Sequence, residues 1–223
     1  IKPETSEQKS IGFVYAPTNA FSFNVDWWDV TLEDQVQRIQ QNQVFADPVK
    51  YSDLFTTKFN RGTGQDELAI IQAAVNIGKA NNQGIDYGMN LTNELSFGTI
   101  KTSLTGTYII ESERLRLGTT NTYDTSLDMF GDNNQVTFRN VVRLTNTLTH
   151  GDFEHSLNVN FRNGYQDQRF AGGSTRIRLR EEVGTRYDGG VQLNVASYTL
   201  LNYTTRYFVN DNLNVTLGIN NLL

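Results

Sequence analysis

Residues 191–223 contain the clearest strand pattern of the chain: Val191-Gln-Leu-Asn-Val-Ala-Ser-Tyr-Thr-Leu-Leu-Asn-Tyr-Thr-Thr-Arg-Tyr-Phe-Val209, then Asn210-Asp-Asn212, then Leu213-Asn-Val-Thr-Leu-Gly-Ile219-Asn-Asn-Leu-Leu223. In both halves apolar or aromatic residues alternate with polar ones, and a period of two residues predicts β-strands with two different faces. The Asn-Asp-Asn segment predicts a tight turn, because these side chains tolerate left-handed backbone and bond to their own main chain. In a soluble sandwich the apolar side chains would face the core, and the outward face would carry more charge than this polar face does. The hairpin therefore favours a membrane β-barrel, with lipid outside and water inside.

Composition agrees with a barrel. Hydrophobic residues make up 38% of the 223 residues, below the roughly 45–50% of a typical globular domain. A chain this polar is poorly suited to fill a thick soluble core, but its strand patterns are too regular for a disordered chain. A polar, water-filled lumen removes the conflict, because half of the strand residues then need not be apolar.

Charge and residue usage exclude several classes of function. The net charge is −5 and the pI is about 5.1, which argues against nucleic acid as a partner. The chain has no cysteine, so disulfides, thiolate metal sites and cysteine nucleophiles are excluded. No apolar run approaches the length of a spanning helix. Ile1-Lys-Pro-Glu-Thr5 does not resemble a signal peptide, so we expect the chain to begin within a longer protein.

The remaining strands follow the same pattern. Short turns alternate with long loops over about 40–83, 112–134 and 166–190, as in outer-membrane barrels. We predict strands at about 6–15, 21–27, 84–97, 100–110, 135–148 and 153–162, besides the two of the first hairpin. The pattern blurs around Trp28–Thr31, which predicts either a bulge or the exit from the bilayer there. The predicted fold is all-β: an antiparallel meander of about eight strands that forms part of a larger transmembrane β-barrel.

Alternation also predicts which side chains share a face. The residues expected to face lipid are Ile11, Phe13, Phe23, Val25, Ile85, Tyr87, Leu104, Val159, Leu217 and Ile219. Those expected to face the interior are Asp26, Asp86, Asn90, Lys101, Arg139, Arg143, Asn158 and Asn160. Periodicity alone leaves two other functions open, a passive porin-type channel and a soluble antiparallel β binding module.

Several segments together resemble the C-terminal barrel part of TonB-dependent outer-membrane receptors. Lys2-Pro-Glu-Thr-Ser6 with Gly12-Phe-Val14 and Pro17 is similar to a recurring strand and turn of that family. The other segments with a resemblance are Val25-Asp-Trp-Trp-Asp-Val30, Asn76-Ile-Gly78, Gln83-Gly-Ile-Asp86, Ser197-Tyr-Thr-Leu200 and Gly218-Ile-Asn-Asn-Leu222. No single motif is specific, but their order and spacing cover nearly the whole chain.

The resemblance implies an architecture, a function, a location and a set of partners for the whole protein. Such receptors have a barrel of about 22 strands and a plug, and they import scarce nutrients with energy from the TonB complex. Residues 1–223 would then be the C-terminal portion of the barrel, with the plug domain and the last strand absent from this chain. The implied location is the outer membrane of a Gram-negative bacterium. The implied partners are outer-membrane lipid, the TonB complex through the N-terminal part, and a small-molecule or oligomeric nutrient.

The residues offer no set of catalytic groups, so we expect no enzyme and no cofactor. Asp26, Asp29, Glu33 and Asp34 could suggest a cation site, but lumenal carboxylates are more often solvated or paired, and we expect no bound metal. His150 and His155 are expected to be ordinary turn and interface residues.

Six residues are candidates for ligand binding. Arginines on one face of an extended segment can bind oxyanions, because guanidinium bonds them bidentately. Two such rows occur in the expected loops, beside acidic neighbours that could pair with them instead. Trp28 points by its phase toward the lumen, where aromatic rings can stack on ligands. The candidates are Trp28, Arg114, Arg116, Arg176, Arg178 and Arg180.

Overall fold

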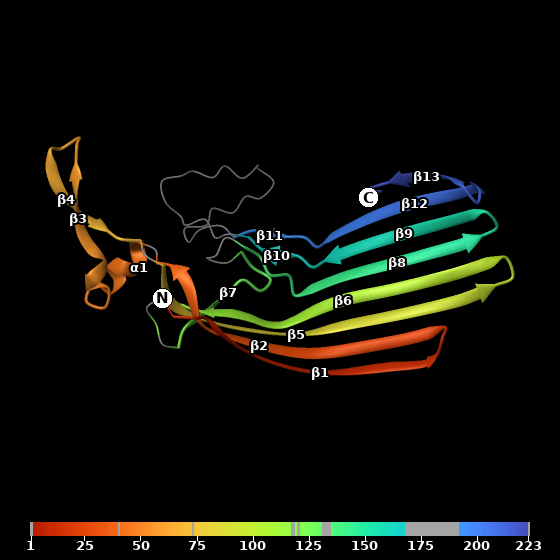
Figure 1. The fold of residues 1–223 in the computed structure, drawn as a ribbon, viewed down its shortest axis with the longest axis horizontal. Helices are drawn as coiled ribbons and strands as arrows, with labels where there is room; N and C mark the ends of the chain where they lie inside the picture. The colour runs from red at the N-terminus through yellow and green to blue at the C-terminus, as the bar shows by residue number, and fades with distance from the viewer. Residues whose placement is uncertain are drawn as a thin grey trace, which may run out of the picture. The chain divides into compact units, whose positions relative to one another are not determined.

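The computed structural model describes residues 2–39, 41–72, 74–116, 119, 121–130, 135–167 and 192–222. Eight strands follow one another in the sheet order β1-β2-β5-β6-β8-β9-β12-β13 (Figure 1). Their bounds are β1 Thr5–Thr18, β2 Phe21–Arg38, β5 Ala74–Leu95, β6 Gly98–Leu115, β8 Asn140–His150, β9 Phe153–Arg162, β12 Tyr198–Asn210 and β13 Leu213–Ile219. A short strand β7, Tyr123–Thr125, pairs with β6. The predicted antiparallel meander is confirmed, and since β1 and β13 end the order, the described sheet is open.

The hairpin on which the prediction was based forms as expected. β12 ends at Asn210 and β13 begins at Leu213, and the Asn212 N–H donates to Asn210 Oδ1 at 3.0 Å. This side-chain bond within the turn is the reason why Asn is suited to it. The other short turns join β1 to β2, β5 to β6 and β8 to β9, and they lie at the same end of the sheet as this one (Figure 1).

Side-chain contacts show that the sheet has a polar face. Asn24 Nδ2 donates to Asp26 Oδ2 at 3.2 Å, and a Cβ added to Gly88 would lie 2.4 Å from Asn24 Oδ1. Thr107 Oγ1 donates to Asp86 Oδ1 at 2.6 Å. Together with strand alternation and register, these contacts define the polar face, which includes Asp26, Asp86, Asn90, Lys101, Arg143, Asn158 and Asn160.

The opposite side is the apolar face. Cross-strand neighbours Leu104, Leu144, Val159 and Leu201 form a row across β6, β8, β9 and β12. The expected lipid-facing set lies on this side: Ile11, Phe13, Phe23, Val25, Ile85, Tyr87, Leu104, Val159, Leu217 and Ile219. The division into two faces is therefore confirmed.

Within the described residues, the apolar face is not packed against a second sheet. Leu213, Val215, Leu217 and Ile219 are 52%, 48%, 67% and 55% exposed. A soluble sandwich would bury such a row, since burying apolar surface is its main source of stability. The exposed row therefore argues against the soluble antiparallel β module that periodicity left open.

The chain divides into two compact units, and the first covers 1–9, 29–82 and 112–125. Its small core consists of Ile39, Val44 and Tyr51, with Leu54, Phe55 and Ile70 packed against it. Around this core lie helix α1 (Gln41–Ala46), a 3-10 turn (Ser52–Leu54) and a hairpin of β3 (Phe55–Asn60) and β4 (Gln65–Ile70). The sequence prediction had only a loop here. No helix in the described residues is long and apolar enough to cross a membrane.

Two other strand predictions were wrong in detail. β5 begins at Ala74, ten residues before the predicted Gly84, because Asn81-Asn82-Gln83 interrupts the apolar alternation and is joined to β6 by polar contacts. Asn81 Nδ2 donates to Glu113 Oε1 at 2.8 Å, and Ser112 Oγ donates to Asn82 Oδ1 at 2.9 Å. β2 runs on through Trp28–Thr31 to Arg38, beyond the predicted 21–27. The left-handed residue in β2 is Asp34, with φ of 56°, which Asp tolerates.

Candidate functional site

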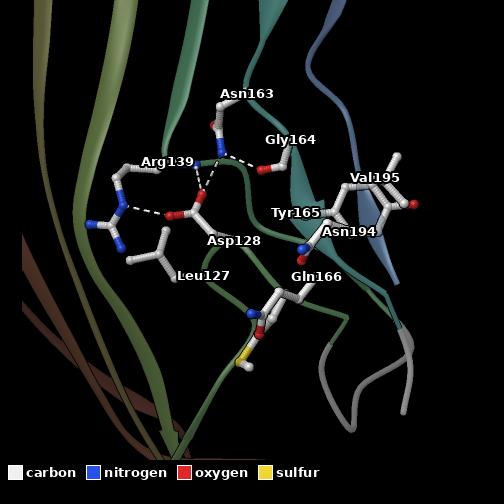
Figure 2. Close-up of a pocket in the computed structure, with 10 residues that line it drawn as sticks. Leu127, Asp128, Arg139, Asn163, Gly164, Tyr165, Gln166, Asn194 and Val195 are labelled. Carbon is white, nitrogen blue, oxygen red and sulfur yellow. Dashed lines mark hydrogen bonds and ion pairs between the residues drawn. The ribbon is translucent and has the colours of Figure 1, made fainter. Parts of the chain in front are cut away.

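A hollow of about 480 Å³ lies beyond the starts of β8 and β12 and the end of β9, in the second unit (10–28, 83–111 and 126–223). We call it the mouth pocket, and Figure 2 shows its lining. It lies at the end of the strands opposite the short turns, where long connections join them. Its lining residues are Leu127, Asp128, Met129, Arg139, Asn163, Gly164, Tyr165, Gln166, Asn194 and Val195.

The wall of the pocket is built from short backbone pairings. Met129 pairs with Gln166, whose N–H donates to the Asp128 carbonyl at 2.8 Å. β10 (Tyr165–Gln166) pairs in turn with β11 (Asn194–Val195). Asp128 has a φ of 56°, a left-handed conformation that Asp adopts more readily than most residues. This conformation turns the chain so that the Asp128 carboxylate faces the start of β8.

The Asp128 carboxylate links three segments. It accepts hydrogen bonds from the Arg139 backbone N–H at 3.0 Å, from Arg139 Nε, and from Asn163 Nδ2 at 2.6 Å (Figure 2). Asn163 Oδ1 also accepts a bond from the Asn140 N–H at 2.8 Å. Partial burial acts to raise the pKa of Asp128, but the bonds from Arg139 and Asn163 and the Arg139 charge outweigh it, so the pKa is lowered. The same ion pair raises the pKa of Arg139.

Because the pKa of Asp128 is lowered, the stability of the pocket wall depends on pH. The Asp128 contribution is fully present above the ordinary aspartate pKa of about 4 and is lost as the pH falls through the lower folded-state pKa. We expect Asp128→Asn to weaken protection of the amides of residues 124–130 by about 1 kcal/mol at pH 7, after allowing for solvent exposure. The variant should also lose the pH dependence that the wild type shows as the pH falls below about 4, the ordinary aspartate pKa.

Hydrogen exchange on the full-length protein measures this effect. Asp152→Asn is a suitable control, because Asp152 lies exposed in the turn between β8 and β9. The control should exchange as the wild type does. Equal protection of residues 124–130 in wild type and Asp128→Asn at pH 7 would show that the carboxylate does not hold this wall.

The remaining pocket groups are mostly neutral. The Tyr165 ring packs edge-on against Phe138, with centroids 5.9 Å apart. Gln166 and Asn194 lie opposite each other in the β10–β11 register and are exposed. Because Asp128 and Arg139 neutralise each other, the pocket offers amide and phenol groups without excess charge. Such groups suit hydrogen bonding to a polar ligand, as in other ligand pockets.

Arg139 was expected to face the barrel interior from a strand starting at Gln135. In the structure β8 starts only at Asn140, and the Arg139 side chain pairs with Asp128. The residues before Asn140 form isolated bridges, Leu127 with Thr137 and Phe130 with Val136. Arg139, whose charge the sequence predicted for the lumen, therefore forms an ion pair with Asp128 beside the pocket.

Arg114 and Arg116 lie in the first unit, at the end of β6. Arg116 Nε donates to both carboxylate oxygens of Asp124, at 2.8 and 3.0 Å, and Arg116 Nη2 also bonds Asp124. Arg114 lies opposite Asp124 in the β6–β7 register, and its side chain is exposed. Asp124 therefore forms an ion pair with the Arg116 guanidinium. The sequence left such pairing with an acidic neighbour open as the alternative to oxyanion binding. Arg176, Arg178 and Arg180 lie outside the described residues.

Trp28 lies on the polar face, as its phase predicted. Its ring covers Gly84, so closely that a Cβ added there would lie 2.4 Å from Trp28 Cζ2. Trp28 Nε1 is buried and has no hydrogen-bond partner in the described part of the chain. Trp28 thus packs along the wall of the sheet. Within the described residues there is no group of three or more His, Cys, Asp or Glu that could hold a metal ion.

Sequence reasoning missed Asp128 and Asn163, the two residues that organise the pocket with Arg139. Both lie where the sequence showed only polar connections, and neither belongs to a repeating pattern. Asn163-Gly164 directly after β9 is the one available signal, since this dipeptide is typical of turns.

The comparisons agree with this architecture. The family described as TonB dependent receptor-like, beta-barrel, matches residues 1–222. The siderophore receptor PirA from Acinetobacter baumannii has a TM-score of 0.63 at 18% identity, over 100% of this chain and 28% of that one. The outer membrane transporter YddB from Escherichia coli gives 0.57 at 12% identity, over 99% and 29%.

A third solved structure is the ferripyoverdine receptor of the Pseudomonas aeruginosa outer membrane, bound to ferripyoverdine. Its TM-score is 0.54 at 12% identity, over 99% of this chain and 23% of that chain. At such identities the likeness shows the fold alone. The chain spans less than a third of the length of each of these structures. No curated relative matches the chain by sequence.

Proposed function

The chain belongs to the TonB-dependent receptor β-barrel family, and we propose that it forms part of a receptor that imports a scarce nutrient across the outer membrane of a Gram-negative bacterium. The family is one of receptors and transporters rather than enzymes. The observation that carries the proposal is the family match over 1–222 together with a meander whose two faces differ in polarity. Such a wall suits lipid on one side and a water-filled passage on the other.

The rest of the receptor is proposed to lie in other parts of a longer protein. Residues 1–223 supply the C-terminal portion of the barrel, and the plug, the TonB-binding segment and the last strand are expected elsewhere in that protein. Outer-membrane lipid would cover the apolar face, and the TonB complex would act through the N-terminal part. A passive porin-type channel remains the second candidate, because it would use the same wall.

The mouth pocket supports a ligand site at the end of the wall opposite the short turns, the side that is extracellular in outer-membrane barrels. Its amide and phenol groups and its neutralised ion pair favour a polar nutrient, either a small molecule or an oligomer. Two of the similar structures are named as a siderophore receptor and a ferripyoverdine receptor, so ferric chelates belong among the compounds to be tested.

Uptake measurements separate the two candidates. Labelled ferric chelates, oligosaccharides and peptides are offered to cells with the full-length gene, without it, and with it but lacking TonB. We expect one compound to accumulate only when both the gene and TonB are present. Accumulation that needs the gene but not TonB would identify a passive channel. Identical uptake of every compound in all three strains would leave the import proposal without support.

A further inference from the structure

Within the described residues, the apolar face carries a polar cluster that the receptor function does not use. We call it the polar notch: Thr102, Asn146, His150, His155 and Tyr203. His150 Nε2 lies 3.0 Å from His155 Nε2, and His155 Nδ1 lies 2.7 Å from the Tyr203 hydroxyl. Thr102 Oγ1 donates to Asn146 Oδ1 at 2.7 Å. The register places these residues on the same face as Leu104, Leu144 and Val159.

The notch lies at the level of a membrane interface. His150 is the last residue of β8, directly before the short turn, and its ring stacks on that of Phe153. Phe153 in turn packs on Tyr207, with centroids 4.7 Å apart, and aromatic residues mark the interface in membrane barrels. A strand tilted by about 45° rises about 2.3 Å per residue along the membrane normal, which places His155 about 7 Å inside the turn.

Polar groups on the inner side of the interface need partners, because unsatisfied groups that reach the hydrocarbon cost several kcal/mol each. The histidine pair shares one proton between its two Nε2 atoms when both rings are neutral. If His155 donates to His150, Tyr203 donates to His155 and the His150 Nδ1–H remains available. If His150 donates to His155, His155 donates to Tyr203 and the Tyr203 O–H remains available. In either arrangement the chain ends in a hydrogen-bond donor.

The notch is also hollowed. A depression of about 230 Å³ is lined by Ile100, Asn146, Leu148, His155, Leu157 and Tyr203. Its floor is largely apolar, and its polar atoms come from Asn146, His155 and Tyr203. Asn146 Nδ2, a second donor beside the depression, has no hydrogen-bond partner among the described residues. A ligand that fits should therefore combine acceptor oxygens with hydrocarbon.

We propose that the polar notch binds the phosphodiester and glycerol-ester region of a phospholipid in the leaflet at the short-turn end. The inference rests on the outer-membrane placement proposed above. The phosphate and ester oxygens accept bonds from the His150–His155–Tyr203 chain and from Asn146. The acyl chains lie along Leu157 and the row Leu104, Leu144 and Val159, farther from the short turns.

Native mass spectrometry of the full-length receptor in detergent tests the proposal, with phosphatidylglycerol as the probe. The arms of the comparison are dipalmitoyl phosphatidylglycerol, diacylglycerol with the same chains, and inorganic phosphate. We expect the wild type to retain phosphatidylglycerol, and Tyr203→Phe to bind it roughly tenfold more weakly through loss of a hydrogen bond to a charged group. His155→Phe should lose the site altogether.

Tyr207→Phe is the matched control, because it makes the same change on the same face of β12, beside Phe153. It should bind lipid as the wild type does. Tyr203→Phe removes a single oxygen, so the test stands even if His155→Phe fails to fold. Equal binding in wild type and Tyr203→Phe, or equal binding of diacylglycerol, would overturn the proposal. Displacement of the lipid by inorganic phosphate would assign the notch to a free anion instead.

These experiments test the lipid-binding proposal and the import proposal separately. Loss of the lipid difference with TonB-dependent uptake intact would refute only the notch. Absence of the protein from isolated outer membranes would refute the placement on which both proposals depend.

Discussion

Val159→Arg is expected to destabilise the full-length barrel by about 2–4 kcal/mol, the usual cost of a charge on the lipid side near the bilayer midplane. Val159 lies on the apolar face, between Leu144 of β8 and Leu201 of β12. It is six residues from the start of β9, about 14 Å along the membrane normal for a strand tilted by about 45°. An arginine there has no water within reach. Urea-induced unfolding of the receptor in lipid vesicles measures the change in free energy.

Asn160→Arg is the control, because the next residue of the same strand faces the other way. Asn160 lies on the polar face, opposite Arg143 and Leu200 in register. A lumenal arginine remains hydrated, so the cost should be well under 1 kcal/mol apart from some repulsion by Arg143. Similar free-energy losses in the two variants would mean that the faces have been assigned to the wrong environments.

Gly84→Ala should destabilise the same barrel by about 1–3 kcal/mol, a typical cost of overpacking. The added Cβ would lie 2.4 Å from Cζ2 and 2.8 Å from Cε2 of Trp28. The indole is rigid, so the ring has to leave the wall or the two strands have to separate. In a Trp27→Phe background, Trp28 fluorescence should shift to longer wavelength as the ring becomes exposed to water.

Gly218→Ala provides the comparison, since Gly218 also lies on the polar face of a strand. Its added Cβ would have Thr204 Oγ1 as its nearest neighbour, at 3.6 Å, an ordinary contact. This variant should be neutral or stabilising by up to about 1 kcal/mol, because alanine restricts the unfolded chain. A Gly84→Ala receptor as stable as Gly218→Ala would argue that Trp28 is not packed over Gly84.

The sequence predicted those parts of the fold in which burial differs between the two faces. Along Leu213–Ile219 every second side chain is apolar, and a one-residue shift would exchange the faces, so alternation specifies the strand and its orientation together. The turn at Asn210 was readable because its side chain bonds within the turn. Each of these signals depends on residues close together in sequence.

Other parts were not readable, because polar contacts across strands leave no periodic pattern. The early half of β5 is joined to β6 through Asn81 and Asn82, and Asn76 bonds the backbone carbonyls of Lys2 and Asp34. Each of these side-chain amides is hydrogen-bonded to a partner at least thirty residues away in sequence. A single sequence does not reveal such partners, so the strand was placed too late.

The candidate site was predicted only in part, for the same reason. Trp28 was correctly placed on the polar face, but its packing on Gly84 depends on register between strands. Asp128, Arg139 and Asn163 come from three segments separated by up to 35 positions. Their types suit an ion pair with an amide bridge, yet nothing in their spacing joins them.

The meander order has a consequence for how such a chain can change over generations. Every main strand pairs with the next one along the chain, so lengthening the connection between β9 and β12 alters no pairing. Doubling a flexible connection costs only about 0.6 kcal/mol in closure entropy. The walls can thus stay constant while the connections that surround the mouth pocket diverge freely. Descendants of one barrel could acquire new ligands by insertion and deletion, with little effect on whether they fold.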